Sequence, residues 1–62
     1  MNLKTKLEQE KRELDEKIER LNNFLMSDKA NQIEDVQRAL LHVQSIAMNT
    51  YSQCLLERIT RI

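Results

Sequence analysis

The chain has 62 residues, and its ten basic and ten acidic side chains cancel to a formal net charge of zero. This balance excludes the strong positive field that recruits nucleic acid or an anionic membrane, so we expect no DNA partner. Glycine and proline, which the turns of β-rich folds use most, are both absent, so the composition predicts an all-α fold. The single cysteine excludes an intramolecular disulfide framework.

The N-terminal residues lead directly into charged sequence with no apolar region of a signal peptide. No stretch approaches the roughly 20 apolar residues of a membrane span. We therefore expect a cytoplasmic protein without a membrane partner.

Residues 3–26 have the pattern of a first helix. Apolar residues recur at three-and-four spacing at Leu7, Leu14, Ile18, Leu21 and Leu25, with Lys11 at the one polar gap. At about 100° per residue, this apolar stripe is only about 60° wide.

Residues 27–32 break the pattern with Ser, Asp and Asn, which favour caps and turns. A second helix is predicted over residues 33–61, because Glu34 and Asp35 at its start and Arg58 and Arg61 at its end suit the helix dipole. Two long helices with a short connection predict one domain, an antiparallel hairpin. The alternative is a single unbroken helix in a parallel coiled coil, but no heptad register continues through residues 26–33.

The second helix carries an apolar arc of roughly 220°, far wider than the stripe that faces it. Because one narrow stripe cannot cover this arc, we expect the hairpins to assemble into a homo-oligomeric helical bundle. The residues predicted for the oligomer interface are Leu41, Met48, Leu55, Ile59 and Ile62. Cys54 lies in the middle of the arc and is predicted to be a small buried hydrophobic residue.

The chain contains no catalytic constellation, phosphate loop or metal-ligand spacing. The only histidine, His42, projects to the polar side of the second helix, as a solvated residue does. We expect no enzyme activity, no cofactor and no metal site.

Polar residues also occur within and beside the apolar arc, and they have two interpretations. Gln44 could form a hydrogen bond that sets the register of a helix interface, as buried polar residues do in coiled coils. Alternatively, Gln44, Tyr51, Arg58 and Arg61 could line a ligand pocket between protomers. The planar fork of arginine suits phosphate, and the tyrosine ring could stack on a base.

The run from Leu40 to Tyr51, followed by Leu55 and the pair Arg58-Ile59, resembles a pattern in small phage proteins. Its Gln, Met and Tyr spacing is similar to the helical core of phage anti-CBASS sponges. A related hairpin occurs in anti-Thoeris sponges, which bind cyclic ADP-ribose isomers. The run from Leu14 to Leu25 is also similar to that group, so the resemblance covers about residues 13–59.

The resemblance implies a phage protein that acts in a bacterial host cell as a multimer of hairpins, often a hexamer. It would hold a cyclic di- or trinucleotide signal where protomers meet and sequester it without cleavage. Gln44, Met48, Tyr51 and Arg58 are the positions that match the pattern. The alternative is a ligand-free helical oligomerisation or host-protein interaction module. A coiled-coil DNA-associated regulator is disfavoured by the balanced charge.

Overall fold

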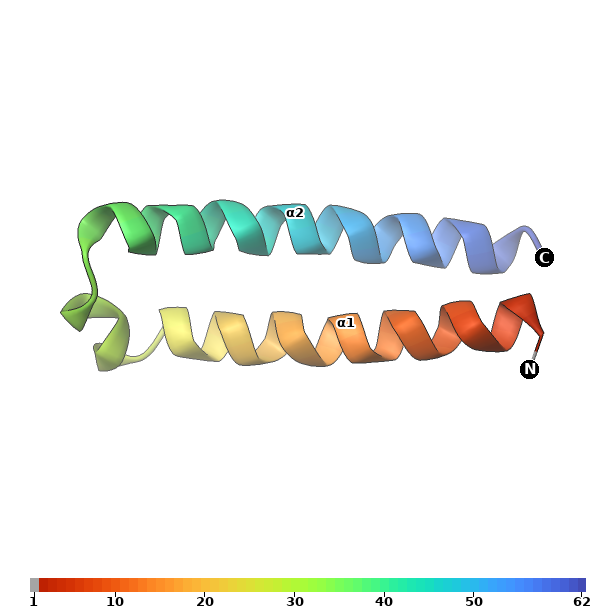
Figure 1. Ribbon diagram of the computed structural model, residues 1–62, viewed down its shortest axis with the longest axis horizontal. Coiled ribbons are helices and arrows are strands. Elements are labelled where there is room, and N and C mark those ends of the chain that lie inside the picture. Colours follow the sequence, from red (N-terminus) through yellow and green to blue (C-terminus); the bar gives the residue numbers. More distant parts are fainter. Residues whose placement is uncertain (1) are drawn as a thin grey trace.

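The computed structural model describes residues 2–62, which form an antiparallel pair of long helices (Figure 1). Helix α1 spans Leu3–Leu25, a short 3₁₀ helix η1 spans Asp28–Gln32, and helix α2 spans Asp35–Thr60. Residues 2–62 contain no strand, which confirms the all-α prediction and the helical hairpin. The start of α1 and the end of α2 lie at the same end of a molecule that measures 43 × 15 × 14 Å. The expected turn is itself partly helical, and α2 begins two residues later than the predicted residue 33.

Hydrogen bonds of short polar side chains cap the start and the end of α1. The Asn2 side chain accepts a hydrogen bond of 2.8 Å from the Thr5 backbone N–H, which would otherwise have no intrahelical partner. At the other end, the Ser27 hydroxyl donates to the Phe24 carbonyl at 2.6 Å. Because Ser27 adopts extended backbone geometry, the chain leaves the helix there and turns towards α2.

Arg38 connects the turn to the first turn of α2. Its guanidinium donates to the Ala30 carbonyl at 3.1 Å and to the Asp35 carboxylate at 2.7 Å. Ala30 is buried at the tip of the hairpin. One side chain therefore links the turn to the start of α2.

The hydrophobic core is small and lies between the two helices. It consists of Leu7, Leu14 and Ile18 from α1 and Leu55 from α2, and Met48 and Ile59 pack against it. A core of this size in a chain of fewer than about 70 residues supplies only a few kcal/mol without an additional source of stability. No helix within residues 2–62 is long and apolar enough to span a membrane.

Leu55 should be the most sensitive position in this core, because it is completely buried. We expect Leu55→Ala to lower the free energy of unfolding by about 2–5 kcal/mol, enough to remove most of the helical circular dichroism signal at 25 °C. The matched control is Leu56→Ala, at the next residue, where the side chain is 41% exposed and the loss should be below about 1 kcal/mol. Equal losses at the two positions would contradict the assignment of Leu55 to the core.

Candidate functional site

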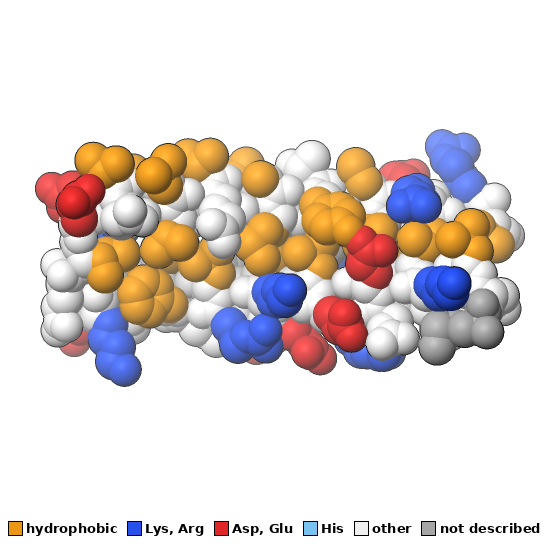
Figure 2. Space-filling view, viewed as in Figure 1, with side chains coloured by type: hydrophobic (Ala, Val, Ile, Leu, Met, Phe, Trp, Pro, Cys, Tyr) orange, Lys and Arg blue, Asp and Glu red, His pale blue; other side chains and the backbone are white. Residues whose placement is uncertain are grey.

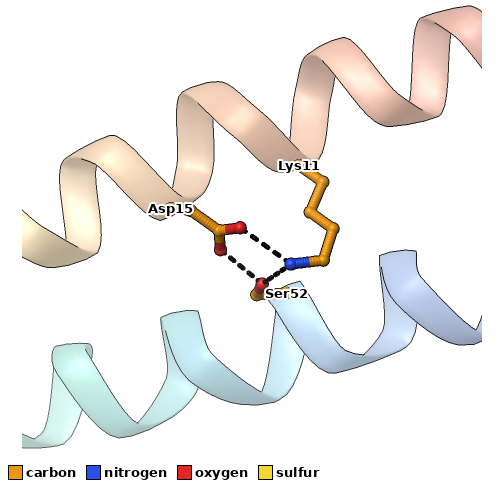
Figure 3. Close-up of polar contacts among 3 residues, drawn as sticks. All are labelled: Lys11, Asp15 and Ser52. Carbon is orange, nitrogen blue, oxygen red and sulfur yellow. Dashed lines mark hydrogen bonds and ion pairs between the residues drawn. The ribbon is translucent and has the colours of Figure 1, made fainter.

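A closed set of polar contacts joins the two helices near the middle of the core (Figure 3). The Lys11 ammonium lies 2.7 Å from one oxygen of the Asp15 carboxylate and donates to the Ser52 hydroxyl at 3.1 Å. The Ser52 hydroxyl in turn donates to the other Asp15 oxygen at 2.5 Å. The hydrogen bonds from Lys11 and Ser52 hold the pKa of the Asp15 carboxyl below its ordinary value. These three groups satisfy one another, which is the arrangement of a structural contact.

A second polar contact lies two helical turns further along the hairpin. The buried Ser45 hydroxyl donates to the Asn22 side-chain oxygen at 2.7 Å. Asn22 follows Asp15 by seven residues and Ser45 precedes Ser52 by seven, so the two contacts belong to one antiparallel register. A slip of α2 by one residue would leave both buried serines without partners, at a cost of about 1–3 kcal/mol for each group. The serines therefore set the register inside the hairpin.

This set of polar residues was not predicted from the sequence. Its only trace was the polar gap at Lys11 in the apolar stripe. The available signal was the matched spacing of seven in both helices. Two small hydroxyl side chains at that spacing are typical of helices that approach each other closely around polar contacts.

The predicted ligand-binding residues are all exposed on α2. Gln44, Tyr51 and Arg58 are seven residues apart, so they lie on one line along the helix at intervals of about 10.5 Å. The Gln44 amide lies 3.9 Å from the Met48 sulfur. Arg61 follows one turn after Arg58, at the end of the helix. Gln44, Tyr51 and Arg58 therefore share one edge of α2, whereas Arg61 projects about 100° away from Gln44 around the helix, and all four side chains are exposed.

The predicted oligomer-interface residues have different positions. Leu55 is fully buried within the hairpin, Met48 and Ile59 pack against the same core, and Leu41 is half-buried. These four side chains already have packing contacts within a single chain, because they lie on the side of α2 that faces α1. Ile62 is exposed at the C-terminal end.

A different apolar surface is left uncovered, on the side of α2 away from α1. We call it the open face, and its residues are Val36, Leu40, Val43, Ala47, Thr50 and Cys54, with Ile46 and Tyr51 at its borders. Figure 2 shows hydrophobic side chains gathered along α2, with charged side chains along α1 and at the two ends of α2. Within the hairpin, the prediction that Cys54 is buried is wrong, because the residue lies on this face and is exposed.

An open groove of about 440 Å³ lies on another side of the hairpin, between α1 and the end of α2. Its charged lining consists of four acidic residues, Glu8, Asp15, Glu16 and Glu19, and two basic ones, Lys11 and Arg12. The acidic excess disfavours a phosphate-bearing ligand. None of the predicted ligand-binding residues lines this groove. Within residues 2–62, no three His, Cys, Asp or Glu side chains are grouped closely enough to hold a metal ion.

Comparison with known proteins gives one match. The Sequestin family model matches residues 1–61, which is nearly the whole chain, and the protein belongs to the Sequestin family. No curated protein and no solved structure matches it.

The contact between Asp15 and Ser52 makes the stability of the hairpin depend on pH. Because the pKa of Asp15 is lower in the folded chain than its value of about 3.9 in an unfolded chain, its carboxylate stabilises the fold above about pH 4. This contribution is lost as the pH falls through the folded-state pKa. We expect thermal melts from pH 2 to pH 6 to show a smaller change in Tm for Asp15→Asn than for the parent chain. The control Glu16→Gln, at the exposed neighbouring position, should keep the parent profile, and an unchanged profile for Asp15→Asn would contradict the assignment.

Proposed function

We propose that this protein is a phage-encoded immune-evasion protein that oligomerises and sequesters a cyclic nucleotide signal without cleaving it. The observation that carries the proposal is the exposed line of Gln44, Tyr51 and Arg58 along the edge of an apolar face that no part of the same chain covers. Membership of the Sequestin family, whose name refers to sequestration, supports a binding role.

The chemistry of this edge suits a nucleotide with phosphate groups. The Arg58 guanidinium can form two parallel hydrogen bonds to a phosphate, and Arg61 adds a second positive charge one turn away. The Tyr51 ring can stack on a base, and the Gln44 amide can both donate to and accept from a base edge. The line therefore combines the three interactions that recognise phosphate, ring and base edge.

A single hairpin is a poor container for such a ligand. Small-molecule sites usually bury 70–90% or more of the ligand surface, whereas these side chains lie along a convex helix. A second chain that packs beside the line would supply the missing walls and exclude water from the phosphate contacts. For this reason the proposal requires a homo-oligomer, with the ligand held where protomers meet.

Binding without turnover fits the positions of the reactive groups. His42 precedes Tyr51 by nine residues, which at about 100° per residue places it about 180° away around α2. Asp15 is engaged by Lys11 and Ser52 between the two helices. Neither group lies beside the proposed line as a general base would.

The second candidate is a ligand-free oligomerisation or host-protein interaction module. It is favoured by the apolar character of the open face, where Val36, Val43 and Ile46 are each more than 60% exposed. Exposed apolar patches of this kind mark protein interaction sites. In this case the line of Gln44, Tyr51 and Arg58 would only border a protein interface.

A thermal-shift assay separates these two functions. The purified protein is melted with a panel of cyclic dinucleotides, cyclic trinucleotides and cyclic ADP-ribose isomers. A ligand at about 100 times its Kd stabilises the folded state by about 2.7 kcal/mol, which for a small domain is a rise in Tm of roughly 10–20 °C. An oligomer whose Tm does not change with any member of the panel at high excess would contradict sequestration of a cyclic nucleotide.

The role of Arg58 is tested with the ligand that gives the largest shift. We expect Arg58→Ala to remove most of that shift while the mass measured by light scattering stays unchanged. Arg20→Ala is the matched control, since it removes one exposed arginine from α1 and should keep the full response. Loss of response in both variants would indicate a general charge effect and contradict a site at Arg58.

A further inference from the structure

Helix α2 carries two seams with the three-and-four spacing of coiled coils. The first faces α1 and consists of Leu41, Ser45, Met48, Ser52, Leu55 and Ile59. The second is the open face, where the spacing from Val36 to Cys54 is again four, three, four, three and four residues. A helix with one seam needs one partner helix, so the second seam indicates a second partner.

The hairpin exposes more surface than is expected for a folded monomer of its mass. The chain exposes 4863 Å². A folded monomer of 7.4 kDa is expected to expose about 4,200 Å². The excess of about 650 Å² is close to the roughly 800 Å² that each protein buries in a stable interface of standard size. The small core of a single hairpin leads to the same conclusion, because oligomerisation is one of the few sources of stability open to so short a chain.

We infer that the open face of α2 binds the open face of a second copy, with the two α2 helices antiparallel and crossing at Ala47. The charges at the two ends of the face determine this direction. Glu34 and Asp35 stand at its start, and Arg58 and Arg61 stand at its end. A parallel pair would place like charges together at both ends, whereas an antiparallel pair places acidic ends beside basic ends and opposes the helix dipoles.

The position of the crossing follows from the same charges and from side-chain size. The midpoint between Glu34 and Arg61, like that between Asp35 and Arg58, falls within one residue of Ala47. Alanine at the crossing point lets the two backbones approach closely.

On either side of Ala47, side chains of different size face each other across the interface between the two copies. Leu40 comes opposite Cys54 of the second copy, and Val43 comes opposite Tyr51. This alternation is how helix faces interdigitate at native packing density. A parallel pair would instead stack Ala47, Thr50 and Cys54 each on its own copy and leave that half of the face loosely packed.

The pairing also determines which residues of the second copy lie beside Gln44, Tyr51 and Arg58. This consequence alone rests on the proposed function. In an antiparallel pair the equivalent edges of the two helices lie beside each other. With the crossing at Ala47, Gln44 of one copy comes opposite Thr50 of the other, which places it one residue from Tyr51. Each ligand site would take residues from both chains.

Disulfide formation without any ligand tests the direction of the pair. Leu40→Cys should be cross-linked under mild oxidation to the native Cys54 of the second copy, giving a covalent dimer on a non-reducing gel. The parent chain should not be cross-linked, because its two Cys54 residues would be 14 positions apart along the antiparallel helices, about 21 Å, far beyond the 4.4–6.8 Å between Cα atoms that a disulfide requires. Leu40→Cys combined with Cys54→Ala is the matched control and should remain uncross-linked.

Each other result contradicts the inference in a defined way. Rapid cross-linking of the parent chain through Cys54 would indicate a parallel pair. An absence of cross-linking in Leu40→Cys would exclude the crossing at Ala47. Because no nucleotide is present, either result leaves the thermal-shift test of the proposed function independent.

Sedimentation tests whether the open face is the contact. We expect the parent chain to sediment at a multiple of its 7.4 kDa mass. Val43→Lys should lower the mass to that of a single chain at micromolar concentration, because it places a charge on the apolar seam of both copies. His42→Lys, at the preceding residue on another side of α2, should keep the oligomer. A monomeric parent chain, or equal dissociation in both variants, would overturn the assignment.

Discussion

Helix α2 has apolar side chains on two opposite sides, and α1 is able to cover only one of them. The side that faces α1 buries Leu55 and forms the core, while the other side leaves Val36, Leu40 and Val43 in contact with water. A two-helix hairpin cannot bury both apolar sides of α2, because α2 has only one neighbouring helix within the chain. The small core, the large exposed area and the expected assembly all follow from this imbalance between the two helices.

Polar contacts inside the hairpin determine which side of α2 remains open. Ser45 and Ser52 are buried on the side of α2 that faces α1, and their hydroxyls donate to Asn22 and Asp15. A rotation of α2 about its axis would break both contacts and leave buried polar groups unsatisfied. The direction in which the open face points is thus set by hydrogen bonds on the opposite side of the same helix.

This division between the two sides of α2 is the structural basis of the proposed function. The charged and hydroxyl groups between α1 and α2 are paired with one another and hold the structure together. The line of Gln44, Tyr51 and Arg58 has no such partners within residues 2–62 apart from the contact of Gln44 with Met48, so its polar groups are available to a ligand. Its position at the border of an apolar face places it where a neighbouring copy would exclude water. Assembly and ligand binding would then depend on the same surface.

The all-α fold and the helix positions could be predicted from the sequence, because a lack of glycine and proline and the apolar spacing act locally along the chain. The excess apolar arc of α2 was also visible, since the width of an arc depends only on residue spacing. The part of the arc that α1 covers was decided by tertiary structure. Leu55 and Cys54 are adjacent and both apolar, yet one is fully buried and the other exposed, because the contacts of Ser45 and Ser52 fix the rotation of α2. That rotation depends on pairs of residues 23 and 37 positions apart, which local periodicity in one helix does not reveal.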